Sequence, residues 1–191
     1  MRSVDRRSEP ARTAGRERSS LGSHIRSIPG FPQPGIVFRD ITPLLASPAG
    51  LDAAVRGLTD ATRALRPDVV IGAEARGFLL GPAVARELGA GFVPARKPGK
   101  LPGETVSAEY ILEYGVDALE MHADALADGA RVLLHDDLLA TGGTARALAK
   151  LAEGAGAQIA GCAFLVELAF LGGREQLAGY DVHALIAYDR E

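Results

Sequence analysis

Several residue types that commonly mark metal sites, disulfides and nucleic-acid platforms are scarce in this sequence. The 191-residue chain has one cysteine, Cys162, and no tryptophan. A single cysteine excludes an internal disulfide and a cysteine zinc cluster. The four histidines show no HExxH or HxxxH spacing, so we expect no dedicated zinc site. Aromatic residues make up 5% of the chain, too few to build a stacking platform for single-stranded nucleic acid.

Long apolar runs are also absent. Asp, Glu, Arg or Gly interrupts each run well before the ~20 residues that a membrane-spanning helix needs, so we predict no transmembrane segment. Hydrophobic residues make up 47% and charged residues 24% of the chain, which is typical of a globular protein.

The charge is unevenly distributed along the chain. Residues 1–23 contain six arginines and three acids, a net charge of +3, and few large apolar side chains. Such a segment cannot bury enough apolar surface to offset its ordering entropy, so we predict a disordered tail over 1–23 and one folded domain over 24–191. The tail could be inert, a targeting segment or an arm that binds polyanions. The domain has 15 basic and 21 acidic residues, which argues against nucleic-acid binding.

Short apolar segments alternate with segments of helical periodicity after residue 24. Residues 29–35 (PGFPQPG) are too rich in proline and glycine for a helix or strand and predict a shaped loop. Apolar strands separated by helices are typical of an α/β fold, in which a central parallel sheet is flanked by helices and binds ligands at the carboxyl ends of its strands. The predicted helices cover 51–65, 78–88 and 143–154, and the predicted strands cover 68–73, 91–95, 131–136, 158–168 and 183–188.

The most informative segment is VLLHDDLLATGGT, residues 132–144. It predicts a buried strand that ends in Asp136 and Asp137, then a loop of small residues, then a helix. Backbone N–H groups, two hydroxyls and the helix N-terminus of such a loop can bind a phosphate, and adjacent carboxylates can hold a sugar diol near magnesium. A strand-to-helix turn with a capping threonine is the structural alternative. The candidate loop ligands are Ala140, Thr141, Gly142, Gly143 and Thr144.

This segment resembles the phosphoribosyl pyrophosphate signature of type I phosphoribosyltransferases, and its flanking segments are similar to those of the adenine-specific members. One departure is His135, where the family usually has a hydrophobic residue. We expect His135 to point into a helix-covered face and to have no catalytic role. The similar segments, in the family's order, are FPQPGIVFRDI (31–41), EARGF (74–78), RKPGKLP (96–102), LEYG (112–115) and LVEL (165–168).

The resemblance implies a transferase that makes AMP and pyrophosphate from adenine and phosphoribosyl pyrophosphate in purine salvage. It also implies a small N-terminal hood, a flexible flap, a homodimer and a cytoplasmic location. Magnesium would be held by diphosphate and ribose oxygens and by water, near Asp136 and Asp137, without direct protein ligands. Breaking the bond at the anomeric carbon would give an oxocarbenium-like ribosyl group, which the two carboxylates would favour.

The leaving diphosphate needs positive charge, which Arg76 and the basic loop after residue 95 can supply. A solvated basic loop is the alternative. In similar enzymes one such base reaches across a dimer. The resemblance assigns adenine binding to Val37, Phe38 and Arg39, although Phe38 alone would equally suit the core. The candidate pyrophosphate ligands are Arg76, Arg96, Lys97 and Lys100.

Residues 99–115 mix glycine and proline with β-forming residues, which suits a flap that excludes water from the site. By resemblance, Glu113 handles the proton on the imidazole edge of the purine, and Tyr114 closes against the base or the phosphate. Glu104 and Glu109 compete for the role of Glu113, and an exposed loop acid without a role is the alternative.

Two other functions fit parts of this pattern. The same fold could act on hypoxanthine, guanine or xanthine, because base choice depends on residues 37–39 and the flap. A regulator that binds phosphoribosyl pyrophosphate without turnover is the second. Such a protein would need an element that reads DNA or RNA, for which residues 1–23 are too short and the domain too acidic.

Overall fold

The computed structural model describes residues 21–112 and 115–190, with side chains for 21–109 and 117–190. These residues form two compact units that divide between Ala54 and Val55. Leu21, which we assigned to the tail, is helical and 3% exposed, so the folded chain begins earlier than residue 24. Residues 1–20 of the predicted tail lie outside the described residues. Within the described part, no helix is both long and apolar enough to cross a membrane.

The first unit is built on a short antiparallel hairpin. Strand β1 (Arg26–Pro29) pairs with β2 (Val37–Asp40). The predicted loop 29–35 connects them, except that Pro29 belongs to β1. Helix α2 (Thr42–Ala46) follows, and then α3 (Pro48–Thr62), whose last part belongs to the second unit. The hairpin was not predicted, because strands of four residues are at the lower limit of the alternating runs that periodicity detects.

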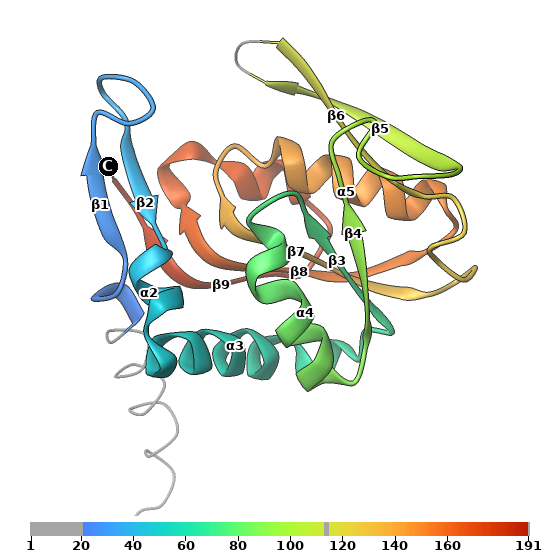
Figure 1. Cartoon of the computed structure of the whole chain (residues 1–191), viewed down its shortest axis with the longest axis horizontal. Helices are drawn as coiled ribbons and strands as arrows, with labels where there is room; N and C mark the ends of the chain where they lie inside the picture. Colours follow the sequence, from blue (N-terminus) through green and yellow to red (C-terminus); the bar gives the residue numbers. More distant parts are fainter. Residues whose placement is uncertain (1–20, 113–114, 191) are drawn as a thin grey trace, which may run out of the picture. The chain divides into compact units, whose positions relative to one another are not determined.

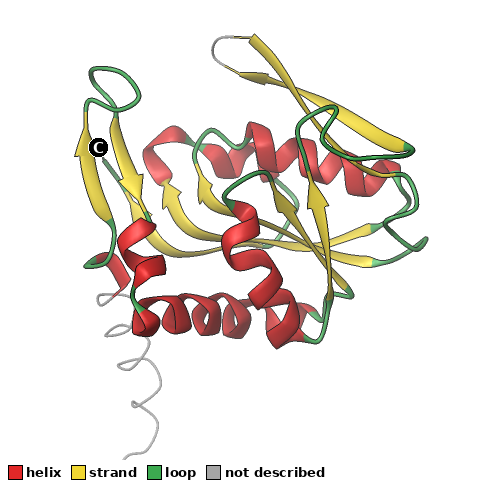
Figure 2. Cartoon of the chain, in the orientation of Figure 1, coloured by secondary structure: helices red, strands yellow, loops and turns green. Residues whose placement is uncertain are grey.

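A five-stranded parallel sheet is the centre of the second unit (Figures 1 and 2). Its strand order is β4-β3-β7-β8-β9, and every neighbouring pair is parallel. All five strands were predicted, with ends within three residues. The strands are β3 (Val69–Ala73), β4 (Gly91–Ala95), β7 (Arg131–Leu139), β8 (Gln158–Leu168) and β9 (Val182–Tyr188).

Helices cover both faces of this sheet, which confirms the predicted α/β fold (Figure 1). Helix α5 (Gly143–Gly154) packs on the face that carries Leu134 and Phe164. Helix α4 (Gly77–Leu88) packs on the opposite face. A Cβ atom on Gly81 of α4 would be 2.6 Å from the ring of Phe92 and 3.3 Å from the ring of His135. The His135 side chain therefore points into a helix-covered face, as predicted.

A second antiparallel pair consists of β5 (Thr105–Leu112) and β6 (Gly115–His122), with Thr105 opposite His122. Two backbone hydrogen bonds of 2.8 Å between Arg96 and Glu120 join β6 to the loop after β4. The predicted flap over 99–115 thus contains one complete strand. We did not predict its partner β6, although apolar Leu119 and Met121 alternate with polar neighbours there, which is a strand signal.

His135 is fully buried in β7. Its Nδ1 lies 2.9 Å from the carbonyl oxygen of Ala163, and its Nε2 has no hydrogen-bond partner among the described residues. Burial lowers the pKa of His135 to about 4, because a low-dielectric interior disfavours the charged imidazolium. The folded protein therefore holds this imidazole neutral at pH 7.

We expect this histidine to make the protein sensitive to mild acid. In the unfolded chain it binds a proton near pH 6.5, but in the folded chain only near pH 4. Between these values the unfolded state binds more protons than the folded state. The free energy of unfolding therefore decreases as the pH is lowered, by about 3 kcal/mol in total. Urea unfolding at pH 7 and pH 4.5 measures the loss. His135→Leu should lose less stability than the wild type, and an equal loss in both would contradict this prediction.

Candidate active site

The small-residue loop between β7 and α5 borders a cavity of about 130 Å³. Gly142 has a φ of +86° and is the N-cap of α5, so the loop leads directly into the helix N-terminus, where N–H groups and the helix dipole favour an anion. The structure gathers seven of the predicted site residues around this cavity. They are Arg76, Asp136, Ala140, Thr141, Gly142, Gly143 and Thr144, and the sequence analysis missed the lining residues Leu138, Leu139, Ala145 and Phe164.

The two aspartates lie within β7 and not at its end, because the strand continues to Leu139. Consecutive strand residues point to opposite faces. Asp136 lines the cavity, whereas Asp137 is 1% exposed and is not part of the lining. Nε of Arg76 lies 3.3 Å from Oδ1 of Asp137. The expectation that both carboxylates face the ribose therefore fits Asp136, while Asp137 contacts a cavity-lining arginine.

The acidic pair is electrostatically costly in this structure. Burial raises the pKa of Asp136 well above its usual value, and repulsion from Asp137 adds to the effect. Burial also raises the pKa of Asp137, against the charge of Arg76. Neither carboxylate oxygen of Asp137 accepts a hydrogen bond from the described residues. Arg76 is the cation beside Asp137, whereas Asp136 lines the cavity and offers the hard carboxylate oxygens that suit a nearby magnesium ion.

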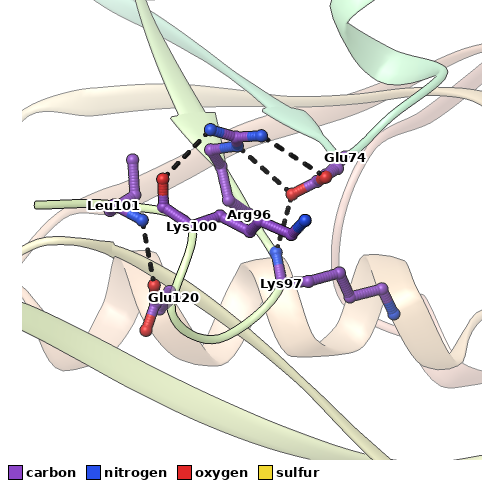
Figure 3. Close-up of polar contacts among 6 residues, drawn as sticks. All are labelled: Glu74, Arg96, Lys97, Lys100, Leu101 and Glu120. Carbon is purple, nitrogen blue, oxygen red and sulfur yellow. Dashed lines mark hydrogen bonds and ion pairs between the residues drawn. The ribbon is translucent and has the colours of Figure 1, made fainter.

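The basic loop after β4 is held by Glu74 (Figure 3). Nε and Nη2 of Arg96 lie 3.2 and 3.5 Å from the Glu74 carboxylate, and the backbone N–H of Lys97 donates to it at 2.9 Å. Nη1 of Arg96 donates to the carbonyl oxygen of Lys100 at 3.1 Å. The bond from Lys97, together with the charges of Arg96 and Lys100, lowers the pKa of Glu74.

These contacts give the predicted pyrophosphate ligands different surroundings. Arg96 is ion-paired with Glu74 and Lys97 with Asp117, whereas Lys100 is exposed. We did not assign a role to Glu74, although it lies two residues before Arg76 in the EARGF segment. A signal was available, because Glu74 and Arg96 follow the carboxyl ends of adjacent parallel strands and must lie close together.

The predicted adenine residues Val37, Phe38 and Arg39 belong to β2 in the first unit, and all three are partly buried. The ring of Phe38 meets that of Phe31 edge-to-face, with centroids 5.2 Å apart. Nη1 of Arg39 donates to the hydroxyl of Ser27 at 2.5 Å. Phe38 is thus partly buried and is not a fully buried core residue.

The two predicted flap residues, Glu113 and Tyr114, lie outside the described residues. Their competitors Glu104 and Glu109 are described, and both are exposed. Glu109 lines a second cavity together with Thr141, Gly143 and Arg146. This places Glu109 near the candidate phosphate-binding loop (residues 140–144).

Comparison of the sequence with known proteins finds a matching family model and many similar enzymes. Residues 41–181 match the family model described as the phosphoribosyl transferase domain. Adenine phosphoribosyltransferase of Rubrobacter xylanophilus is 60% identical over 88% of this chain and 91% of that protein. The enzyme of Solibacter usitatus is 55% identical over 89% and 98%.

Solved structures agree with the sequence relatives. Adenine phosphoribosyltransferase of Thermoanaerobacter pseudethanolicus has a TM-score of 0.88 and 50% identity, covering 90% of this chain and 99% of that one. The enzyme of Saccharomyces cerevisiae, complexed with adenine and an imino-altritol bisphosphate, has a TM-score of 0.84 and 38% identity, covering 90% and 99%.

Proposed function

This chain belongs to the adenine phosphoribosyltransferase family, and from this premise we propose that it converts adenine and phosphoribosyl pyrophosphate into AMP and pyrophosphate in purine salvage. One observation carries the proposal. A small-residue loop at a helix N-terminus, a carboxylate and an arginine line a single cavity. These groups match the three parts of the sugar substrate, which are a terminal phosphate, a ribose diol and a diphosphate.

The loop Ala140–Thr144 binds the 5′-phosphate through backbone N–H groups, the threonine hydroxyls and the dipole of α5. Asp136 accepts hydrogen bonds from the ribose hydroxyls. During the reaction the bond between the anomeric carbon and the diphosphate oxygen breaks, and positive charge develops on the ribosyl group. The carboxylate of Asp136, which lines the cavity, stabilises that charge because it is fixed beforehand in a site of low dielectric.

The leaving pyrophosphate takes its electron pair toward Arg76 and the basic loop. Arg76 is 40% exposed and lines the cavity, and exposed Lys100 adds charge. The ion pair with Glu74 gives Arg96 a second role, which is to fix the shape of that loop. Asp136 lines the cavity where a magnesium ion carried by the diphosphate would lie, and that ion would supply further positive charge.

Adenine binds at Val37–Arg39, where the Phe38 ring offers a stacking surface and the backbone of Val37 reads the amino edge. As the imidazole nitrogen of adenine forms its bond to the anomeric carbon, Glu113 accepts the proton that this nitrogen loses. Tyr114 and the flap exclude water, which limits hydrolysis of the activated sugar. These assignments follow the family resemblance. The partial exposure of Phe38 supports the assignment of adenine binding to Val37–Arg39.

The test is the stoichiometry of the reaction. Adenine, phosphoribosyl pyrophosphate and magnesium are mixed with the enzyme, and AMP and pyrophosphate are quantified by chromatography. We expect equal amounts of both products. Release of pyrophosphate with ribose 5-phosphate in place of AMP would show hydrolysis and contradict the proposal.

We also propose that the chain acts as a cytoplasmic homodimer in which one base of the loop 96–100 reaches the partner's site. Arg96 forms an ion pair with Glu74, and Lys97 forms one with Asp117. These contacts support a basic loop of defined shape. Sedimentation at micromolar concentration should give the mass of a dimer. A monomer with full activity would contradict this prediction.

A further inference from the structure

An ion pair between a buried carboxylate and an arginine whose side chain is 49% exposed lies near the phosphate-binding loop without lining its cavity. Glu167, near the end of β8, is 5% exposed. Arg174 belongs to the short helix η3 (Gly173–Leu177), which follows η2 (Ala169–Leu171). Nε and Nη2 of Arg174 lie 2.6 and 2.7 Å from the two carboxylate oxygens of Glu167. This bidentate pair fixes the start of η3 to the carboxyl end of a central strand.

The start of η3 touches the phosphate-binding loop backbone to backbone. A Cβ atom on Gly173 would lie 2.2 Å from the carbonyl oxygen of Ala140. A Cβ atom on Gly142 would lie 2.5 Å from the carbonyl oxygen of Gly173. Side chains at either position would force the two segments apart, so both glycines are needed for this approach. The register supports the same contact, because Glu167 is paired with Leu139, the residue before the loop.

We propose that Glu167, Arg174 and Gly173 are positioning residues for the ribose 5′-phosphate, a role that rests on the proposed function. The ion pair holds η3, and Gly173 in η3 supports the backbone of Ala140 and Gly142. None of the three lines the cavity around the phosphate-binding loop, so they act through the directions of the loop N–H groups. The effect falls on affinity for the phosphosugar, while the adenine site and the proton transfer are unaffected.

The charge of Glu167 is essential to this arrangement. A buried carboxylate is stabilised by a partner that satisfies both oxygens, which the planar guanidinium does and a lysine ammonium does not. The same contact raises the pKa of Arg174. Losing the pair releases η3 from β8, and the loop that rests on it then samples positions that bind phosphate less well.

The first test uses Glu167→Gln, which keeps the side-chain shape and removes the charge. We expect the KM for phosphoribosyl pyrophosphate to rise about tenfold, since small misplacements of binding groups have effects of this size or larger. The KM for adenine should stay unchanged. Arg131→Gln is the matched control, because Arg131 donates to the carbonyl oxygens of Leu65 and Arg66 at the amino end of β7. It should leave both KM values unchanged.

The second test uses Gly173→Ala, with Gly154→Ala as its control. A Cβ atom on Gly154 meets nothing within 4 Å, so the control adds a methyl group without displacing a neighbour. We expect Gly173→Ala to raise the KM for phosphoribosyl pyrophosphate more than Glu167→Gln does. Calorimetric binding of ribose 5-phosphate should weaken in parallel, and circular dichroism checks the fold of each variant.

These results separate the positioning role from a structural role and from the proposed function. Unchanged affinity for ribose 5-phosphate in Glu167→Gln overturns the inference. A fall in kcat together with an equal rise in both KM values overturns it as well. If Gly173→Ala does not fold, Glu167→Gln alone decides. A wild type that binds ribose 5-phosphate but forms no AMP contradicts the proposed function, and the binding comparison still decides the inference.

Discussion

Replacing Glu113 by alanine is expected to lower kcat by about two to four orders of magnitude, the range typical for loss of a positioned general base. The affinity for phosphoribosyl pyrophosphate should change little, because we assign the binding of the sugar phosphate to Asp136, Arg76 and the loop 140–144. The incoming nitrogen of adenine must lose its proton as its bond to the anomeric carbon forms. Steady-state kinetics together with calorimetric binding of phosphoribosyl pyrophosphate separates the two effects.

Glu104→Ala and Glu109→Ala are the matched controls for this experiment. Both acids are exposed in the same region, and Glu109 lines a cavity beside Thr141 and Gly143. If Glu113 is the base, each control should retain most of its turnover, and the acidic limb of the kcat–pH profile should disappear only in Glu113→Ala. A normal rate in Glu113→Ala, with a large loss in Glu109→Ala, would transfer the role to Glu109.

Arg76→Ala is expected to reduce both catalysis and stability. We expect kcat/KM for phosphoribosyl pyrophosphate to fall by about two orders of magnitude, the usual effect of removing one donor from a developing negative charge. The free energy of unfolding should fall by about 2 kcal/mol, because Asp137 loses the partner of a buried carboxylate. This figure is below that for a fully buried pair, since Arg76 is 40% exposed and partly screened by water.

A second substitution separates these two effects. Asp137→Asn removes the buried charge that Arg76 balances, so the double variant Arg76→Ala/Asp137→Asn should recover most of the lost stability. Its activity should stay low, because the pyrophosphate contact is still missing. Urea unfolding and steady-state kinetics on the four proteins form a double-mutant cycle. A double variant as unstable as Arg76→Ala would show that Arg76 stabilises the fold by other contacts.

The sequence predicted the parts of this molecule whose signals are local. The five sheet strands are continuous apolar runs, and the predicted helix 143–154 coincides with α5. The position of the small-residue loop 140–144 was also predictable, because it lies between a strand and a helix. Its role in binding phosphate stays a prediction. By contrast, β1 and β2 are only four residues long, and their pairing depends on tertiary structure.

The parts that escaped prediction depend on which face a side chain takes and on contacts distant in the sequence. Asp136 and Asp137 are adjacent and were predicted to end a strand, so both carboxylates were expected to face the ribose. The extension of β7 to Leu139 places them on opposite faces. Glu74 and Arg174 were missed for another reason, since each is defined by a partner from another segment, Arg96 and Glu167 respectively. Neither pairing has a local signature.

Base selectivity tests the central claim most directly. The enzyme, phosphoribosyl pyrophosphate and magnesium are incubated in parallel with adenine, hypoxanthine, guanine and xanthine, and nucleotide formation is followed in each. We expect rapid AMP formation with adenine and no comparable product with the three oxopurines. Faster turnover of an oxopurine would contradict the assignment of Val37–Arg39 to adenine, and tight sugar-phosphate binding without turnover of any base would contradict the assignment as an enzyme.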